Sequence, residues 1–341
     1  PIYDDRLRDP GPEARADEVA ALKGFLRDAS QIDTLGLDQE DAITLDMLEV
    51  VCRIQLREHE LNPHHFEALD QMAGPQGLPG DLSRFQRVDT DERVDRLIRR
   101  LELFPEYLAK HRANMLEGIA AGRTSAAVVV GRVIEQTRRA AATPADESPI
   151  LLAHPELDDA TRARVRDAIQ QWVAPALADH VAALEGYAPF AREHEGVWAL
   201  PDGREYYETM ILASTTLEET PEALHEYGRA QLDAIQVETA GIARELKFAD
   251  VGAMRAALAA DPANYAASGA EIVERATAQI ARANAAAPRW FGRLPVAPCE
   301  VRAVEPYQEK EAPPAFYFAP APDGSRPGIY FVNTYQPEQR P

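Results

Sequence analysis

One long stretch, residues 91–122, constrains the fold more than any other part of the sequence. It reads DERVDRLIRRLELFPEYLAKHRANMLEGIAAG. Its apolar residues recur at steps of three and four positions: Val94, Leu97, Ile98, Leu101 and Leu108. That spacing predicts an amphipathic helix with one apolar face turned toward a core. Pro105 predicts a bend or an interruption, and Gly118 and Gly122 mark the end of the helix.

Further stretches repeat this helical pattern, so most of the chain is expected to be helix. They cover residues 125–142, 158–191, about 221–246 and 270–288. The third of them begins at Thr220-Pro221-Glu222. This is an N-cap candidate followed by proline at the first helical position and an acidic residue in the first turn.

The residue composition and pattern change after Pro288. The stretch AFYFAPAPDGSRPGIYFVNTY, residues 315–335, gives two short aromatic and β-branched runs separated by turn residues, which predicts a small β element such as a hairpin. The predicted fold class is therefore mainly α, a multi-helix body with a small β element near the C-terminal end. The predicted domains are a helical domain, 1–287, and a small β-containing segment, 288–341, packed on the helical body and interrupted at its end.

The second run, RPGIYFVN, is expected to be a strand at a sheet edge. Pro327 cannot donate a hydrogen bond to a neighbouring strand, and Gly328 admits unusual backbone angles, so the strand should begin at about Ile329. Alternation sends neighbouring side chains to opposite faces. We expect Tyr330 to face a cleft and Phe331 to face the helical core.

Charge and composition exclude several classes of function. The 341 residues carry a formal net charge of −20, which disfavours binding to nucleic acid or to anionic membrane surfaces. No apolar run approaches the roughly 18 residues of a transmembrane helix. Cys52 and Cys299 are isolated, so neither a disulfide framework nor a thiolate zinc site is indicated, and a single disulfide is left open. The sequence does not identify the cellular compartment. A cytoplasmic location is slightly favoured, and a secreted or periplasmic location is open if a signal peptide has been removed.

The histidines form no spaced set of metal ligands. His59, His194 and His225 each precede a glutamate, as in the zinc-protease signature, but none has a second histidine four residues on. The adjacent His64-His65 pair is interpreted either as solvated surface residues or as a metal site. We therefore predict no metal ligand in this chain, and no stoichiometric zinc bound by the chain alone.

Several motifs in this sequence resemble those of one known family and occur in the same order. LPDGREYY, at residues 200–207, and TPEALHEYG, at 220–228, fit the patterns Leu-Pro-x-Gly-x-x-Tyr-Tyr and Thr-x-Glu-x-x-His-x-x-Gly of the bacterial domain-of-unknown-function family 885. The regions 100–136 and 312–334 are similar to the same family. The resemblance covers the chain from about residue 30 to its end.

This resemblance implies a zinc-dependent, peptidase-like hydrolase with a zincin-like fold when a following segment completes it. That segment, His-Glu-x-x-Pro-Gly-His-His, is absent from these 341 residues. We expect this chain to be the N-terminal portion, with zinc held in the complete protein by the following segment and a peptide or small amide as substrate. The alternative is a non-catalytic helical protein that binds peptides or serves as a scaffold.

In the hydrolase interpretation this chain supplies the walls of the cleft and no catalytic residue. The candidate substrate-binding residues are Tyr206, Tyr207, His225, Tyr317, Arg326, Tyr330 and Asn333. Tyrosines can donate hydrogen bonds to a developing oxyanion, Arg326 can hold a carboxylate, and the free edge of the strand can pair with an extended peptide. The competing interpretation makes Tyr207 an ordinary core residue, His225 a buried histidine bonded to a neighbour, and RPGIYFVN an ordinary hairpin strand with Ile329 and Phe331 in the core.

Overall fold

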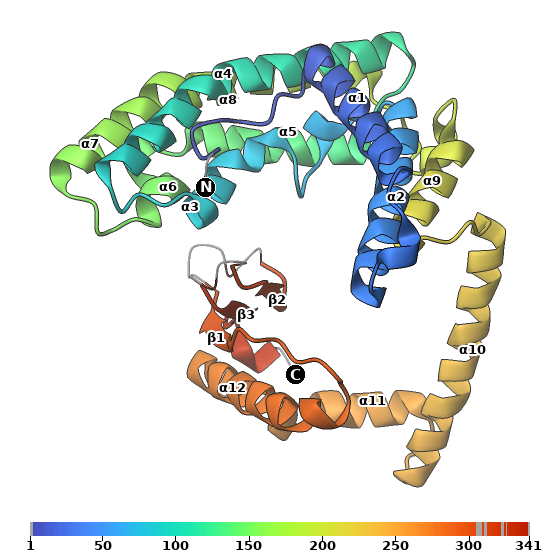
Figure 1. Ribbon diagram of the computed structural model, residues 1–341. Coiled ribbons are helices and arrows are strands. Elements are labelled where there is room, and N and C mark those ends of the chain that lie inside the picture. Colours follow the sequence, from blue (N-terminus) through green and yellow to red (C-terminus); the bar gives the residue numbers. More distant parts are fainter. Residues whose placement is uncertain (1–2, 305–308, 310–311, 322–323, 325, 340–341) are drawn as a thin grey trace. The chain divides into compact units, whose positions relative to one another are not determined.

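Helices make up most of the computed structural model, which describes residues 3–304, 309, 312–321, 324 and 326–339 (Figure 1). The described strands all lie near the C-terminal end, so the predicted fold class is confirmed. The chain divides into two compact units, Pro1–His225 and Glu226–Pro341, which we call unit 1 and unit 2.

Unit 1 is built from helices. They are α1 (Pro12–Ala29), α2 (Gln39–Glu60), α3 (Leu78–Phe85), α4 (Asp91–Ala120), α5 (Ala127–Ala142), α6 (Pro149–Leu152), α7 (Asp159–Ala168), α8 (Ala174–Tyr187) and α9 (Gly203–Thr215). A π-helical turn, Ile169–Val173, joins α7 to α8 just before Pro175, which has no N–H to continue the regular bonding pattern. The predicted start of the next helix, α10 (Pro221–Glu245), is confirmed, because the Thr220 hydroxyl accepts a hydrogen bond from the Ala223 N–H at 3.1 Å.

Helix α4 begins and ends where its sequence indicates. The Thr90 hydroxyl accepts a hydrogen bond from the Arg93 N–H at 3.3 Å and so caps the first turn. Gly122 follows the last turn with φ +68°, a conformation that glycine adopts without strain. The helix continues through Pro105, so the predicted interruption is absent, because the apolar residues on either side of the proline lie on one buried face.

The apolar stripe of α4 forms the centre of the core of unit 1. Leu97, Leu101 and Leu108 are buried with side chains of α3, α6, α7 and α8. A second buried cluster surrounds Met115 near the end of α4 and includes Leu184 of α8. The long helix is thus fixed at both ends by apolar burial, which is the main source of helix stability in globular proteins.

Unit 2 combines the remainder of α10 with two further helices and a small sheet. The elements are α11 (Val251–Ala260), α12 (Gly269–Ala286), β1 (Cys299–Ala303), β2 (Ala315–Phe318) and β3 (Gly328–Val332). Helix α12 packs on β1 and β3. The boundary predicted at residues 287/288 falls between the end of α12 at Ala286 and the start of β1 at Cys299, whereas compactness groups α11 and α12 with the strands. The division into two domains, 1–287 and 288–341, therefore stays a prediction.

The sheet has the strand order β1-β3-β2. Strand β3 is parallel to β1 and antiparallel to β2. Strands β2 and β3 form the predicted hairpin. Residues 322–323 and 325 of its turn lie outside the described part of the chain. The prediction that this strand lies at a sheet edge is wrong, because β1 supplies a second partner. Pro327 does not prevent this, since it precedes the first paired residue, Gly328.

The two faces of β3 are also occupied differently from the prediction. The Phe331 ring stacks on Phe316 with the centroids 4.9 Å apart, and Phe318 lies on the same face. Tyr330 points to the opposite face, where it and residues of α12 line a shallow pocket of about 460 Å³. The prediction that Phe331 faces the helices is therefore wrong, because in unit 2 the helix covers the tyrosine side of the sheet.

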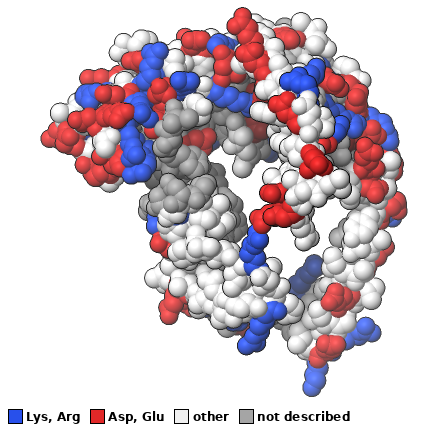
Figure 2. Space-filling view, viewed as in Figure 1, with Lys and Arg blue, Asp and Glu red and all other residues white. Residues whose placement is uncertain are grey.

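Charged side chains of both signs lie beside one another over unit 1 in the face that Figure 2 shows. Of the described helices, none is long and apolar enough to cross a membrane. Cys52 is buried and Cys299 is partly exposed, and both are free in the structure.

Candidate functional site

Unit 1 contains a pocket of about 440 Å³ between the segment that precedes α1, the end of α2, and α9. Its lining residues are Arg8, Asp9, Pro10, Arg15, Glu18, Gln55, Glu58, His59, Leu61, Pro63, His64, Glu67, Tyr206, Thr209 and Met210. The lining carries both signs of charge and is rich in groups that form hydrogen bonds. A concave site with a few convergent polar groups is the usual form of a small-ligand or peptide site.

Tyr206 connects this pocket with a second one. The neighbouring pocket, of about 370 Å³, is lined by Phe66, Tyr107 and His111, and Tyr206 lines both pockets. The Tyr206 ring meets the Phe66 ring edge to face with centroids 6.0 Å apart, and burial raises the pKa of its hydroxyl. The hydroxyl therefore stays protonated and can donate a hydrogen bond.

A buried arginine fixes α9 to the other wall of the pocket. Arg123 forms an ion pair with Asp202, which directly precedes α9, and donates a hydrogen bond to the carbonyl oxygen of Leu61. Its guanidinium also lies over the Phe66 ring, 5.5 Å from the centroid. The position of Tyr206, one turn into α9, follows from these contacts.

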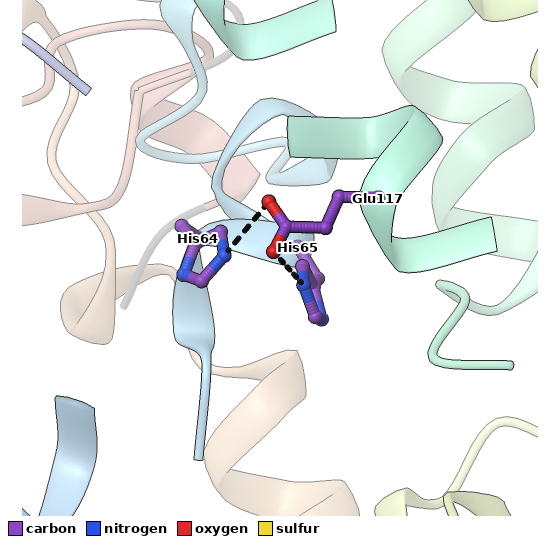
Figure 3. A group of neighbouring side chains, drawn as sticks. All are labelled: His64, His65 and Glu117. Carbon is purple, nitrogen blue, oxygen red and sulfur yellow. Dashed lines mark ion pairs between the residues drawn. The ribbon is translucent and has the colours of Figure 1, made fainter. Parts of the chain in front are cut away.

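Two buried histidines and a glutamate meet behind the pocket (Figure 3). Nε2 of His64 lies 3.4 Å from Oε2 of Glu117, and Nε2 of His65 lies 3.8 Å from Oε1 of the same carboxylate. We call these three residues the His64–His65–Glu117 cluster. His64 and His65 are only 5% and 3% exposed, so the interpretation of the pair as solvated surface residues is wrong. They are buried because the short 3₁₀ turn Pro63–His65 packs against α4.

Local geometry brings the turn and the helix together. Asn62 directly precedes the turn and adopts a left-handed backbone, φ 50°, which asparagine tolerates better than most residues. Gly118 of α4 has no side chain to keep the turn away: a Cβ there would lie 3.0 Å from the Cβ of His65. Glu117, the preceding residue, then reaches both imidazoles.

The surroundings keep both imidazoles neutral at physiological pH. Burial, the nearby Arg15 and His65 lower the pKa of His64 to about 4, although Glu117 acts in the opposite direction. Burial also lowers the pKa of His65, with Arg123 adding to the effect and Glu117 opposing it. Neutral imidazoles can bind a metal ion, whereas protonated ones cannot.

The residues predicted from the family motifs in the helical part do not lie together. Tyr206 lines the pocket, but Tyr207, the next residue of α9, is 49% exposed and lines none of the described pockets. His225, on α10, is exposed. Of these three residues, Tyr206 is the one that the structure places in the pocket of unit 1.

The predicted residues of unit 2 are mostly engaged in holding its sheet and loops. Asn333 is 2% exposed, and its amide donates to the carbonyl oxygens of Glu309 and Ala312 at 2.6 and 2.9 Å. Arg326 donates to the carbonyl oxygen of Ala319 at 2.6 Å. Tyr317, 54% exposed, pairs across the sheet with Tyr330.

Sequence reasoning missed the partner of the histidine pair. The sequence offers His64 and His65 as possible metal ligands, but Glu117 lies far along the chain on a different helix, so no short motif joins the three. The only local signal is the pair of adjacent histidines after Pro63.

Comparison with known proteins gives a family and a fold. The bacterial protein family of unknown function DUF885 matches residues 1–341. A crystal structure described as "the putative lipoprotein from Colwellia psychrerythraea" matches with a TM-score of 0.87 and 21% identity, over 98% of this chain and 62% of that one. A "putative lipoprotein of unknown function from Shewanella oneidensis" matches with a TM-score of 0.65 and 18% identity, over 98% and 60%.

At these identities the likeness shows the fold alone. The chain spans about three fifths of the length of these two solved proteins. No curated protein matches it.

Proposed function

The chain belongs to the bacterial protein family of unknown function DUF885, and we propose that it is the substrate-binding portion of a zinc-dependent, peptidase-like hydrolase. The pocket of unit 1 binds a peptide or small amide. When bound, zinc polarises the scissile carbonyl and lowers the pKa of a water molecule. In this proposal the ligands for the catalytic zinc belong to a segment outside these 341 residues.

The observation that carries the proposal is the pocket of unit 1 with Tyr206 at its junction with the second pocket. Peptides carry charge at both ends and hydrogen-bonding groups between them. Arg15 and Glu58 are among the charged residues that line the pocket, so groups of both signs are available to the two ends of a peptide. Tyr206 can donate a hydrogen bond to a carbonyl oxygen of the substrate or to the oxyanion that forms from it.

The chain's place in the cell is proposed from its relatives. Both solved relatives are described as putative lipoproteins, and this favours a location outside the cytoplasm, contrary to the slight preference expressed from the sequence. Fractionation of cells that produce the protein from its own gene tests this. Recovery with the cytoplasmic fraction alone contradicts it.

Hydrolysis of a mixed peptide library by the whole protein tests the proposed activity. We expect cleavage that a chelator abolishes and that added zinc restores. A protein that binds peptides in calorimetry without cleaving them, with zinc present, would instead be the non-catalytic peptide-binding protein that the sequence left as the alternative.

A further inference from the structure

The His64–His65–Glu117 cluster has the dimensions of a metal site. A zinc ion lies about 2.0–2.2 Å from nitrogen and oxygen ligands, so two ligands at a tetrahedral angle are about 3.4 Å apart. The separations of Glu117 oxygens from Nε2 of His64 and of His65 are 3.4 and 3.8 Å. One ligand atom from each residue lies within 4.8 Å of the other two, so small rotations of the side chains close the remaining distance.

Three of the four ring nitrogens of the two histidines have no hydrogen-bond partner in the described part of the chain. Nε2 of His64 and both ring nitrogens of His65 are buried and make no hydrogen bond to any residue that the structure describes. Nε2 of His65, 3.8 Å from Oε1 of Glu117, is too far for a hydrogen bond, and Nε2 of His64, 3.4 Å from Oε2, is longer than an ordinary one. Buried polar atoms without partners are costly, which is why each such atom calls for a partner.

The site also has an open side. His64 lines the pocket of about 440 Å³, whereas His65 and Glu117 do not. A cation held by three protein ligands would therefore keep a coordination position on the pocket side, where water or a ligand in the pocket could bind. Two imidazoles and one carboxylate with an open position form a ligand set typical of zinc and other divalent transition metals.

We propose that His64, His65 and Glu117 bind one divalent transition-metal ion, zinc or a close analogue, at the wall of the pocket of unit 1. Neither the family description nor the relatives assign such a site. The inference concerns only residues of this chain and holds whether or not the proposed hydrolysis is found.

Arg15 is the feature that most opposes a cation at this site. Its guanidinium lies 3.6 Å from Oε2 of Glu117. The same side chain is held by the carbonyl oxygen of Pro10 at 2.7 Å and by Oδ1 of Asn114 at 2.9 Å. Its position is thus fixed beside the carboxylate, where it orients Glu117, as outer partners of metal ligands do. Repulsion between Arg15 and the ion lowers the affinity but leaves the ligand geometry intact.

The test is zinc binding to the purified chain after removal of bound metal, measured by calorimetry and by metal analysis. We expect one zinc per molecule with a dissociation constant in the micromolar range or tighter. Co²⁺ is the second probe, since imidazole and carboxylate ligands give its bound form a visible absorption spectrum that zinc should abolish by competition.

Variants of the three proposed ligands show whether the zinc binds at the His64–His65–Glu117 cluster. His64→Gln and His65→Gln should each weaken zinc binding by more than about a hundredfold, beyond the effect of losing an outer partner. Glu117→Gln should weaken it as well. Because the Glu117 side chain is 55% exposed, its replacement leaves folding intact and decides the question even if a histidine variant unfolds.

Two histidines serve as matched controls. His59, which lines the same pocket, lies 3.5 Å from Glu18, and His154 lies 3.2 Å from Glu156. His59→Gln and His154→Gln should bind zinc as the parent chain does. The proposal is overturned if the chain binds no zinc at micromolar concentrations, which is what the sequence alone predicts. It is also overturned if Glu117→Gln binds zinc as the parent does and His59→Gln does not bind it.

Discussion

Gly118 of α4 lies directly against His65. A Cβ added at this glycine would lie 3.0 Å from the Cβ of His65 and 2.8 Å from the carbonyl oxygen of Arg123. The second distance is shorter than real Cβ contacts, and a backbone oxygen cannot easily move away. The absence of a side chain at this position is therefore what lets the turn Pro63–His65 approach the helix and bring both histidines to Glu117.

Gly118→Ala should destabilise unit 1 by about 1–3 kcal/mol, the usual cost of overpacking a filled interior. Gly131→Ala, in the middle of α5, is the matched control because nothing lies within 4 Å of its added Cβ. There alanine should stabilise the helix by about 0.5–1 kcal/mol. Thermal and urea unfolding of the two variants measure the difference. Equal stability of both would show that the contact with His65 does not constrain the fold.

Tyr206→Phe should lower peptide turnover in the whole protein while changing the unfolding free energy by no more than about 1 kcal/mol, since only a hydroxyl group is lost. Tyr207→Phe is the control, because Tyr207 is exposed beside it and lines none of the described pockets. Rates of peptide hydrolysis beside thermal melts separate the effects. If both variants retain full turnover, Tyr206 has no part in the reaction.

The stability of unit 1 should depend on pH through His180. This side chain is fully buried on α8, and burial, with Arg112 and His111 nearby, lowers its pKa to about 4. The unfolded chain, with a histidine pKa of about 6.5, binds the proton more readily, so stability is full above that pH and falls as the pH drops toward 4. Between pH 6.5 and 5 the loss should be about 2 kcal/mol for this histidine.

His180→Leu removes the titrating group and should reduce the loss of stability on acidification. His225→Gln, which removes an exposed histidine, is the control. Urea unfolding at a series of pH values measures both. If His180→Leu loses as much stability as the parent, other groups determine the acid sensitivity.

Val332→Pro should unfold the sheet of unit 2. Val332 pairs with Ala303 of β1 and with Ala315 of β2, so a proline there disturbs a strand bonded on both sides, at a cost of about 3 kcal/mol or more. Val296→Pro, at a fully exposed position outside the strands, is the control and should unfold like the parent. Protection of unit 2 amides from hydrogen exchange reports the result, and unchanged protection in Val332→Pro would contradict the central position of β3.

The sequence determined the elements of this protein whose causes are local. The apolar stripe from Val94 to Leu108 has the period of one helical face, and it forms α4. The Thr220 cap begins α10 where its side chain can accept from the first turn. The Tyr206 motif was found as well, because its residues are neighbours in the chain.

The tertiary structure decided everything that depends on contacts between distant segments. Whether β3 lies at an edge depends on β1, whose pairing leaves no trace in the sequence of β3 itself. The adjacent pair His64-His65 would have the same sequence whether it lay on the surface or in the core, so the sequence does not reveal its burial. Packing of their turn against Gly118 removes them from water and places Glu117 beside them, since burial and proximity are set by chain segments that meet only in the folded state.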